Sequence, residues 1–444
     1  MTELNTPAGH GPAEKWPVAV LALPDAIAGP AAGPRPIRVV KDLIAALPAG
    51  LRLAVAGPER VLGALRHWPE LAGRDWLAVA IDDDVDFTVW AQDPFHVTPT
   101  GLSRGELLFP QDDRRRADAI VAAAVADRLG LAIVRCSGAF DGGNVLEVGD
   151  VTLVGADCQL TPALRQALGN GRRLVVLGGD AYPERHLRLR PDADIVEECG
   201  GHCGARQPIF HLDAFVTPAG RTEDGRARVL VGDSRLAASL LGEALPAGDQ
   251  ALEHPPIMLN QHDRQAPAQL IDSGAISCRP DESIRLESAL ADDLDRLAAE
   301  LSALDGLAVL RNPLPIAPIV DDGWRAWSTR TLARRFAGVA GLDDVLAALG
   351  RRGRTSVAVW RWRVLGQNGA LVFPAARRVI LPTFAHGRLS YLGPCEAANR
   401  ALWRGLGYEV VELPDFLPFA DGHGSPHCMV KLIDRLAPAG PRPG

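Results

Sequence analysis

The sequence predicts one α/β domain assembled from repeated modules of two strands, a helix and a third strand. Four segments share a pattern in which a polar residue precedes an apolar strand, a turn and a second apolar strand. These segments are Asp93–Pro110, Asn144–Asp157, Asp213–Asp233 and Asn368–Pro382. Each is followed by a helix-like stretch and then by a strand rich in β-branched residues. The alternative is an ordinary two-layer α/β protein whose hairpins are similar by chance.

The helices and third strands follow the hairpins in chain order. We expect helices at Arg114–Leu129, Pro162–Leu168, Ser234–Leu241 and Glu396–Leu406. We expect the strands after them at Leu131–Arg135, Arg173–Leu177, Leu307–Leu310 and Tyr408–Glu412. If every hairpin begins near one axis, the polar residues at these beginnings meet. They would form a cavity rich in carboxylates, with one thiol and one imidazole.

A fifth hairpin begins at His427, but the chain ends before a second strand can follow. We expect a strand near the N-terminus, such as Val18–Leu23, to complete it. Residues 244–305 interrupt the repeat, and we interpret them as an insertion together with the helix of the fourth module, Glu282–Leu304. Residues 1–15 and 437–444 are rich in Pro, Gly and small residues and are predicted to be loose tails. This leaves a single domain over residues 16–436.

The composition and charge of the chain argue against some classes of binding partner and location. The net charge is −7, and no basic tract is present, which argues against binding to nucleic acid. No apolar run reaches the roughly 18 residues of a membrane span. The N-terminus lacks the basic and apolar regions of a signal peptide. Seven scattered cysteines, an odd number, favour reduced thiols in the cytoplasm over a disulfide framework.

Cys428 is the candidate nucleophile. It lies in the segment DGHGSPHCMVKLI, where glycines precede it and an apolar strand follows, so the thiol is expected at a loop-to-strand junction. A nucleophilic thiol needs a lowered pKa or a nearby base. The alternative is a cysteine that packs as a small buried apolar side chain.

His211 and Asp213 lie two residues apart in FHLDAFV, so on a strand both side chains point to the same face. A histidine can protonate a departing amine near neutral pH, and a carboxylate beside it can bind a cation. The alternative is a His–Asp pair on a polar sheet face.

Two further carboxylates belong to the predicted cavity. Asp93 lies between apolar residues and before a proline, where burial of its charge calls for a cationic partner. Asp141 precedes two glycines, which would either bring the backbone close to a ligand or make a tight turn into a strand. For both residues the alternative is an ordinary turn aspartate.

The segment EECGGHCGARQPIFH holds a C-x3-C pair, Cys199 and Cys203, around His202, a pattern that invites a zinc interpretation. No second pair with the spacing of a zinc finger follows, so we favour a glycine-rich loop that leads to His211 and gates the cavity. Arg206 in this loop could bind a substrate carboxylate or carbonyl in bidentate fashion. The sequence implies no metal and no cofactor.

One thiol, one imidazole and two carboxylates are the groups required for attack on a guanidinium. The carboxylates would bind the N–H groups of this planar cation in bidentate fashion. A thiolate would attack the central carbon, and the imidazole would protonate the departing amine. Water or an acceptor amine would then release the amidino group from the cysteine.

The motifs resemble those of the guanidino-modifying, or pentein, superfamily, which includes arginine and agmatine deiminases, dimethylarginine hydrolases and amidinotransferases. The nearest resemblance is to the catalytic domain of protein-arginine deiminases. There, W-x-Q-D is similar to Trp90–Asp93, G-N-L-E-V to Asn144–Val148, and H-x-D-x-F to His211–Phe215. A D-F segment followed by H-G and H-C is similar to Asp415-Phe416, His423-Gly424 and His427-Cys428. The four motifs keep the family order, and the resemblance covers roughly residues 17–436.

The resemblance implies a five-bladed, pseudo-symmetric α/β-propeller of ββαβ modules. It implies Cys428 as nucleophile, His211 as acid and base, and Asp93 and Asp213 as the grip on the guanidinium. By the same resemblance Asp141 would orient the catalytic histidine. The remaining substrate-binding candidates are Trp90, as a wall of the site, Asn144 and Arg206.

This sequence also departs from the family pattern. The glycine run before the nucleophile is only partly kept, and the 244–305 segment has no counterpart. Calcium dependence is therefore not carried over.

The expected activity is a hydrolase that converts a guanidino group, in peptidyl arginine or a small molecule, to a ureido group and ammonia. An amidinotransferase would use the same intermediate with an amine acceptor. A catalytically silent binding module is a third possibility, although the four catalytic residue types are all present. A cysteine protease would gain nothing from the two extra carboxylates. The sequence indicates neither the physiological substrate nor the oligomeric state.

Overall fold

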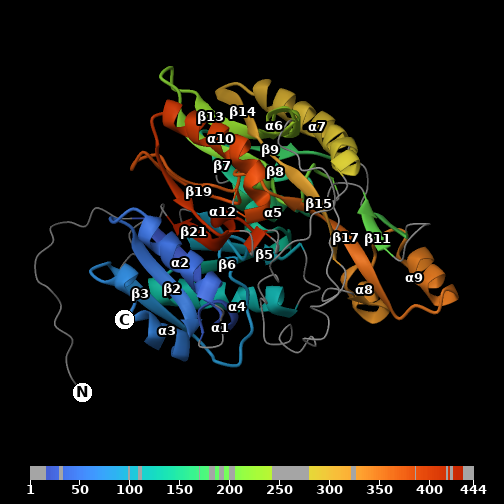
Figure 1. The fold of residues 1–444 in the computed structure, drawn as a ribbon. Helices are drawn as coiled ribbons and strands as arrows, with labels where there is room; N and C mark the ends of the chain where they lie inside the picture. The colour runs from blue at the N-terminus through green and yellow to red at the C-terminus, as the bar shows by residue number, and fades with distance from the viewer. Residues whose placement is uncertain are drawn as a thin grey trace, which may run out of the picture.

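The computed structural model describes residues 17–29, 34–98, 101–108, 113–169, 171–179, 186–189, 195–199, 206–242, 280–321, 327–385, 387–416, 419–420 and 424–433. Its strands and helices form a mixed α/β fold (Figure 1). Both predicted tails lie outside the described residues.

Each of the four predicted modules contains the expected strands and helix. The first is β4 (His96–Thr98), β5 (Gly101–Glu106), α4 (Asp113–Leu129) and β6 (Ala132–Ala139); the second is β7 (Val145–Val148), β8 (Val151–Gly155), α5 (Pro162–Gly169) and β9 (Arg173–Leu177). The third is β12 (Val216–Arg221), β13 (Ala227–Asp233), α6 (Ser234–Leu241), α7 (Pro280–Ser302) and β14 (Leu307–Pro313); the fourth is β18 (Leu371–Phe373), β19 (Arg378–Pro382), α10 (Gly393–Gly405) and β20 (Glu409–Leu413).

Strand pairing is the same in all four modules. The first two strands pair antiparallel as a hairpin, and the third strand pairs parallel with the second. The parallel pairing requires a crossover connection, which the helix supplies. The repeated sequence pattern therefore corresponds to a repeated three-stranded sheet.

The two ends of the chain share the fifth sheet. β21 (Val430–Ile433) pairs antiparallel with β1 (Val18–Ala22), which pairs parallel with β2 (Arg52–Pro58), and β3 (Trp76–Ile81) extends the sheet. The connecting elements are α1 (Asp25–Ala28), α2 (Pro34–Ala46), α3 (Glu59–Leu65) and the short 3-10 helix η1 (Pro69–Leu71). This pairing confirms that an N-terminal strand completes the hairpin that begins at His427.

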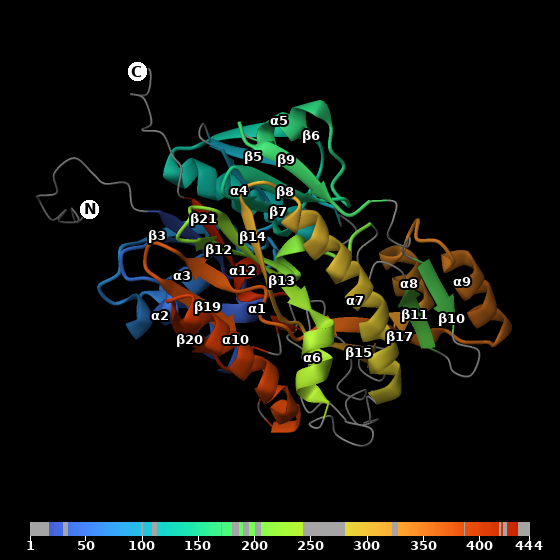
Figure 2. The same cartoon turned by 90° about the horizontal axis from the view of Figure 1, so that it is seen from above.

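A further sheet stands outside the five modules and was not predicted. Its strands are β10 (His186–Leu189), β11 (Ile195–Cys199), β15 (Ile316–Asp321), β16 (Trp327–Ser328) and β17 (Ser356–Val364), accompanied by α8 (Thr329–Arg335) and α9 (Leu342–Arg351). It lies to one side of the molecule in two perpendicular views (Figures 1 and 2). It has its own apolar core around Leu187, Trp327 and Phe336. Its strands come from segments separated by the whole third module, so no local pattern links them.

Within the predicted 244–305 insertion, the structure describes the helix α7 from Pro280 onward. This helix contacts α6, β13 and β14, so it belongs to the third module and not to the fourth module, to which it was assigned from the sequence. Residues 243–279 lie outside the described residues. No helix within the described ranges combines the length and apolar character needed to cross a membrane.

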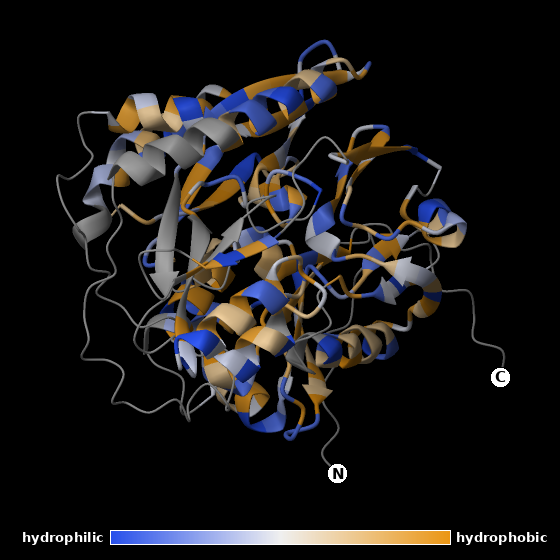
Figure 3. Ribbon diagram, turned by 90° about the vertical axis from the view of Figure 1, so that its right-hand side faces the viewer, coloured by the Kyte–Doolittle hydropathy of each residue, from blue (hydrophilic) through white to orange (hydrophobic). Residues whose placement is uncertain are grey.

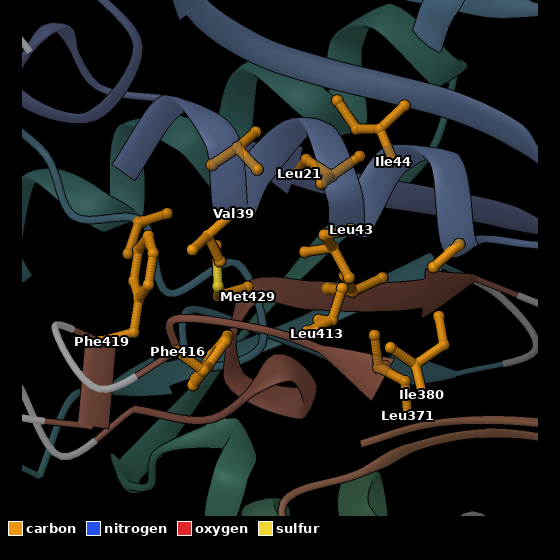
Figure 4. Close-up of a cluster of buried hydrophobic side chains, with 14 of the residues drawn as sticks. Leu21, Val39, Leu43, Ile44, Leu371, Ile380, Leu413, Phe416, Phe419 and Met429 are labelled. Carbon is orange, nitrogen blue, oxygen red and sulfur yellow. The ribbon is translucent and has the colours of Figure 1, made fainter. Parts of the chain in front are cut away.

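The largest apolar cluster joins the N-terminal helix α2 to the C-terminal modules. Leu43 and Leu21 lie near Leu413 and Ile380, and Phe416, Phe419 and Met429 continue the cluster (Figure 4). Helices carry apolar residues on one side and polar residues on the other, as Figure 3 shows. Cys428 and Trp90 belong to this cluster, so the backbone around the candidate nucleophile is anchored in the core.

We expect Leu21→Ala to destabilise the fold by about 2–5 kcal/mol, because Leu21 is 1% exposed in the strand that joins the chain ends. Urea unfolding should show this loss. The matched control is Ile120→Ala on α4, where the side chain is 46% exposed and little change is expected. Equal losses in the two variants would contradict the importance of the β1–β21 junction.

Candidate active site

The first strands of the five module sheets line one cavity of about 230 Å³. Its walls include residues of β4, β7, β12, β18 and β21, together with Asp213 and His427. The beginnings of the hairpins are also tied to one another. The Gln92 amide donates to the Cys428 carbonyl (3.0 Å), and the Gly142 amide donates to the Asp93 carbonyl (3.0 Å). The predicted convergence of hairpin beginnings is therefore present in the structure.

His211 and Asp213 come together, but not by strand alternation. His211 precedes the 3-10 turn η4 (Leu212–Ala214), and Asp213 lies within that turn. His211 Nδ1 lies 4.0 Å from Asp213 Oδ1, so both groups face the same space. The strand that was predicted to carry them begins only at Val216, because the chain turns once before it enters the sheet.

Asp141 holds the imidazole from the opposite side. Its Oδ2 lies 3.0 Å from His211 Nε2, and its Oδ1 accepts a hydrogen bond from the Leu108 amide (3.1 Å). Asp141 is completely buried, so this contact is shielded from water. With Nε2 occupied by Asp141, Nδ1 is the nitrogen that faces the other carboxylates.

Asp93 is the third carboxylate around the imidazole. Its Oδ1 lies 3.9 Å from His211 Nδ1 and accepts a hydrogen bond from the Gly143 amide (3.1 Å). The two glycines after Asp141 allow this packing. A Cβ at Gly142 would lie 1.9 Å from the Gln92 carbonyl oxygen, and one at Gly143 would lie 2.5 Å from His211 Nδ1. The glycine pair thus makes room within the 3-10 turn η2 (Gly142–Asn144) for its neighbours.

Cys428 lies in a single helical turn, α12 (Pro426–Met429), immediately before β21. Its Sγ lies 3.5 Å from Asp213 Oδ2. One donor atom from each of His211, Asp213 and Cys428 lies within 4.8 Å of the others. Such a His–Asp–Cys set also has donor types that bind metal ions. The structure therefore brings together the thiol, the imidazole and both predicted guanidinium-binding carboxylates.

The electrostatic environment favours the protonated forms of both His211 and Cys428. Burial lowers the pKa of His211, but the carboxylates of Asp93, Asp141 and Asp213 outweigh burial, so its net pKa is raised. Burial, together with the charges of Asp213 and Asp93, raises the pKa of the Cys428 thiol well above its usual value. A cation placed between the carboxylates would offset their negative charges and so oppose the rise in the pKa of the thiol.

Two buried polar atoms near the Cys428 thiol have no hydrogen-bond partner among the described residues. Within the described part of the chain, neither His211 Nδ1 nor Asp213 Oδ1 has a hydrogen-bond partner, and both are buried. Buried polar atoms normally have one. The Asp213 oxygen can accept a hydrogen bond from an N–H group of a ligand, and a protonated His211 Nδ1 can donate one.

Asn144 stabilises the backbone on either side of His211 through its side-chain amide. Its Oδ1 accepts hydrogen bonds from the Leu212 amide (3.1 Å) and from Gln207 Nε2 (2.7 Å), and its Nδ2 donates to the Phe210 carbonyl (3.1 Å). These contacts hold the segment on either side of His211. Gln207, which the sequence analysis overlooked, is fully buried and also donates to the Ile209 carbonyl (2.8 Å). A glutamine four residues before a candidate histidine fits no motif, so the sequence alone gives no reason to assign it to the site.

Trp90 lies against the loop of the nucleophile. A Cβ at Gly424 would lie 1.8 Å from the indole, so glycine is required for this close approach. The ring also meets Phe419 edge-on, with centroids 6.3 Å apart. Trp90 therefore packs beside the segment that precedes Cys428.

Arg206 is exposed, and its backbone amide donates to Asp157 Oδ1 (2.8 Å). Its predicted contact with a substrate stays a prediction. Residues 200–205, which include His202 and Cys203, lie outside the described residues, and of Cys199 only the backbone is described, as part of β11. That strand lies in a segment that the sequence analysis interpreted as a glycine-rich loop.

Two residues beside Cys428, Ser425 and His427, were not predicted from the sequence to be site residues. His427 Nδ1 lies 2.8 Å from Asp213 Oδ2, the same oxygen that contacts the thiol. Ser425 Oγ lies 3.2 Å from Cys428 Sγ. Both residues stand in the segment quoted for the nucleophile, but only the turn of α12 shows that their side chains face the site.

Comparison with known proteins shows similarity of fold. No protein-family model matches the sequence, and no curated protein is similar enough in sequence to count as a match. Among solved structures, the chain resembles the agmatine deiminase of Enterococcus faecalis (11% identity, 94% of this chain and 93% of the other, TM-score 0.52). It also resembles a substrate-bound variant of the agmatine deiminase of C. jejuni (10% identity, 94% and 93%, TM-score 0.51). At these identities the similarity shows that the fold resembles that of the two agmatine deiminases.

We expect Asp141→Asn to lower the pKa of His211, because a carboxylate that stabilises the imidazolium is removed. NMR titration of the histidine ring, assigned with His211→Gln, measures this shift. Asp224→Asn, which alters an exposed carboxylate, should leave the titration unchanged. An unchanged pKa in Asp141→Asn would contradict the assigned role of the Asp141 contact.

We expect Asp213→Asn to lower the pKa of the Cys428 thiol, since the variant removes a negative charge that opposes the thiolate. At a fixed pH below that pKa, alkylation by iodoacetamide should become faster, because the thiolate is the reactive form. Asp295→Asn, at a surface ion pair, is the control. Slower alkylation in Asp213→Asn would show that the charge effect has been assigned the wrong sign.

Proposed function

We propose, on the basis of a fold shared with agmatine deiminases, that this protein is a hydrolase acting on a guanidinium group. The products would be a ureido group and ammonia, and the intermediate a covalent amidino-cysteine on Cys428. The observation that carries this proposal is the meeting of Cys428 Sγ, His211 Nδ1 and the carboxylates of Asp93 and Asp213 in one buried space. The roles of these residues are part of the proposal.

A guanidinium satisfies the electrostatic demands of this site. It is a planar cation with N–H groups in a fixed arrangement, which suits carboxylate oxygens on two sides. The unpartnered Asp213 Oδ1 would accept one of these N–H groups. The bound cation would offset the charges of Asp93 and Asp213, lower the pKa of the thiol and so favour the thiolate at the moment of attack.

The proposed chemistry has two steps. The Cys428 thiolate forms a bond to the guanidinium carbon, and His211, protonated at Nδ1, gives its proton to the departing nitrogen as the C–N bond breaks. Neutral His211 then takes one proton from water, whose oxygen forms a bond to the amidino carbon. As the C–S bond breaks, the new hydroxyl group loses its proton to solvent or to the released ammonia, and the neutral ureido product leaves. The thiolate and the protonated imidazole are restored. Asp141 would keep the imidazole oriented through both steps.

We also propose that the five module sheets surround one axis as the blades of a propeller. The first strands of all five sheets line the same cavity, and the two chain ends pair within the fifth sheet. These observations support the arrangement. The candidate site lies where the hairpins begin.

The substrate class is the open choice within this proposal. The short motifs resemble protein-arginine deiminases, whereas the two solved structures compared above are agmatine deiminases. A small guanidine and a peptidyl arginine are therefore both candidates. A cytoplasmic location stays a prediction.

We expect the purified protein to release ammonia and form a ureido product from at least one of agmatine, arginine and a peptidyl arginine. Cys428→Ala should abolish both products, because the covalent step has no other nucleophile. Cys136→Ala, which removes a partly buried thiol on β6, is the matched control and should retain activity.

The assay is repeated with added amines. Transfer of the amidino group to an amine in place of ammonia release with ureido formation would favour an amidinotransferase. Binding of guanidines without turnover in the wild-type protein would favour a silent binding module. Turnover that persists in Cys428→Ala would overturn the proposed mechanism.

A further inference from the structure

We infer that Ser425 is a further catalytic residue, whose hydroxyl donates a hydrogen bond to the Cys428 thiolate. Its role in turnover rests on the proposed function, but its contact with the sulfur does not. Ser425 Oγ lies 3.2 Å from Cys428 Sγ, the atom that would attack the substrate.

The hydrogen bonds around Ser425 leave its proton free for the sulfur. The Cys428 amide donates to Ser425 Oγ (3.3 Å), so this oxygen already acts as an acceptor at the N-cap of α12. A hydroxyl has one proton to donate, and Sγ is within reach of it. The thiol in turn lies 3.5 Å from Asp213 Oδ2 and can donate there. Once the thiol loses its proton, the serine hydroxyl would still donate to the sulfur.

The site needs such a donor because its other features oppose the thiolate. Burial and the carboxylates of Asp213 and Asp93 raise the pKa of the thiol, whereas contacts of the sulfur with the side chain and with the backbone of Ser425 lower it. A hydrogen bond to a charged acceptor is stronger than one to a neutral acceptor. The hydroxyl therefore stabilises the reactive form more than the resting form.

Gly369 fixes the position of this hydroxyl. A Cβ at Gly369 would lie 2.1 Å from Ser425 Cβ and 2.3 Å from Ser425 Oγ. The His427 amide donates to the Gly369 carbonyl (3.0 Å), which holds the two segments together. Glycine at 369 and serine at 425 thus fit one another, and any larger side chain at 369 would displace the hydroxyl.

A capping role alone is the competing explanation, and the chain offers a matched control for it. Ser328 caps α8 in the same way, with its Oγ accepting from the Thr331 amide (3.1 Å), but it lies in the separate sixth sheet. Glycine at an N-cap is nearly as favourable as serine. Ser425→Gly therefore removes the hydroxyl with little loss of capping, whereas Ser425→Ala removes both.

The test measures alkylation of Cys428 by iodoacetamide against pH in the full-length protein, with the Cys428→Ala protein as background. We expect Ser425→Ala and Ser425→Gly to raise the apparent pKa of the thiol. Alkylation at a fixed pH below that pKa should slow roughly tenfold, since one pKa unit changes the thiolate fraction tenfold. Gly369→Ala should act in the same direction, and Ser328→Ala should have no effect.

The outcomes separate this inference from the proposed function because alkylation requires no turnover. A raised thiol pKa in a protein that processes no guanidine would sustain the hydroxyl contact and overturn the proposed function. An unchanged thiol pKa in Ser425→Gly, with an active wild-type enzyme, would overturn the inference and leave the proposed function standing. A pKa shift in Ser425→Ala that is absent from Ser425→Gly would assign the effect to capping and also overturn it.

Discussion

Three buried carboxylates around one imidazole are the constraint on which the rest of this site depends. Asp93, Asp141 and Asp213 are each at most 2% exposed. His211 lies within 4.0 Å of all three, and His427 lies 2.8 Å from Asp213. Burial and the charges of Asp213 and Asp93 raise the pKa of the Cys428 thiol. Burying charged groups is costly, and in the proposed function a cationic substrate would offset these negative charges. Binding of the substrate and activation of the nucleophile would then be coupled through the same carboxylate oxygens.

The fold makes this arrangement possible by repeating one connection. Each module begins with a turn that precedes its first strand, and the first strands share one cavity. Asp93, Asp141, His211 and Cys428 each lie in such a turn rather than within a strand. Turns can present several side chains at short range, whereas the regular strands behind them keep the turns in place. The backbone bonds from Gln92 to Cys428 and from Gly142 to Asp93 then fix neighbouring turns against one another.

Glycine positions show how closely the turns approach. Gly142, Gly143, Gly369 and Gly424 lie where a Cβ would collide with Gln92, His211, Ser425 and Trp90, respectively. In each case the neighbour is a residue of the site or one beside it. The two glycines after Asp141 were predicted either to bring the backbone close to a ligand or to make a tight turn, and the structure shows that they leave room for neighbouring protein atoms. At none of these four positions does the backbone require a positive φ.

The sequence by itself determined the modules, the helix after each hairpin, and the completion of the last hairpin by an N-terminal strand, because these follow from local periodicity of apolar residues. It also identified Cys428, His211, Asp93 and Asp213 from short motifs. Only the tertiary structure decided that His211 presents Nδ1 to Asp93 and Asp213, that Ser425 and His427 lie beside the thiol and Asp213, and that a sixth sheet forms from segments on either side of the third module. Those outcomes depend on contacts between residues distant in the chain or on a single turn of backbone, and neither leaves a period in the sequence.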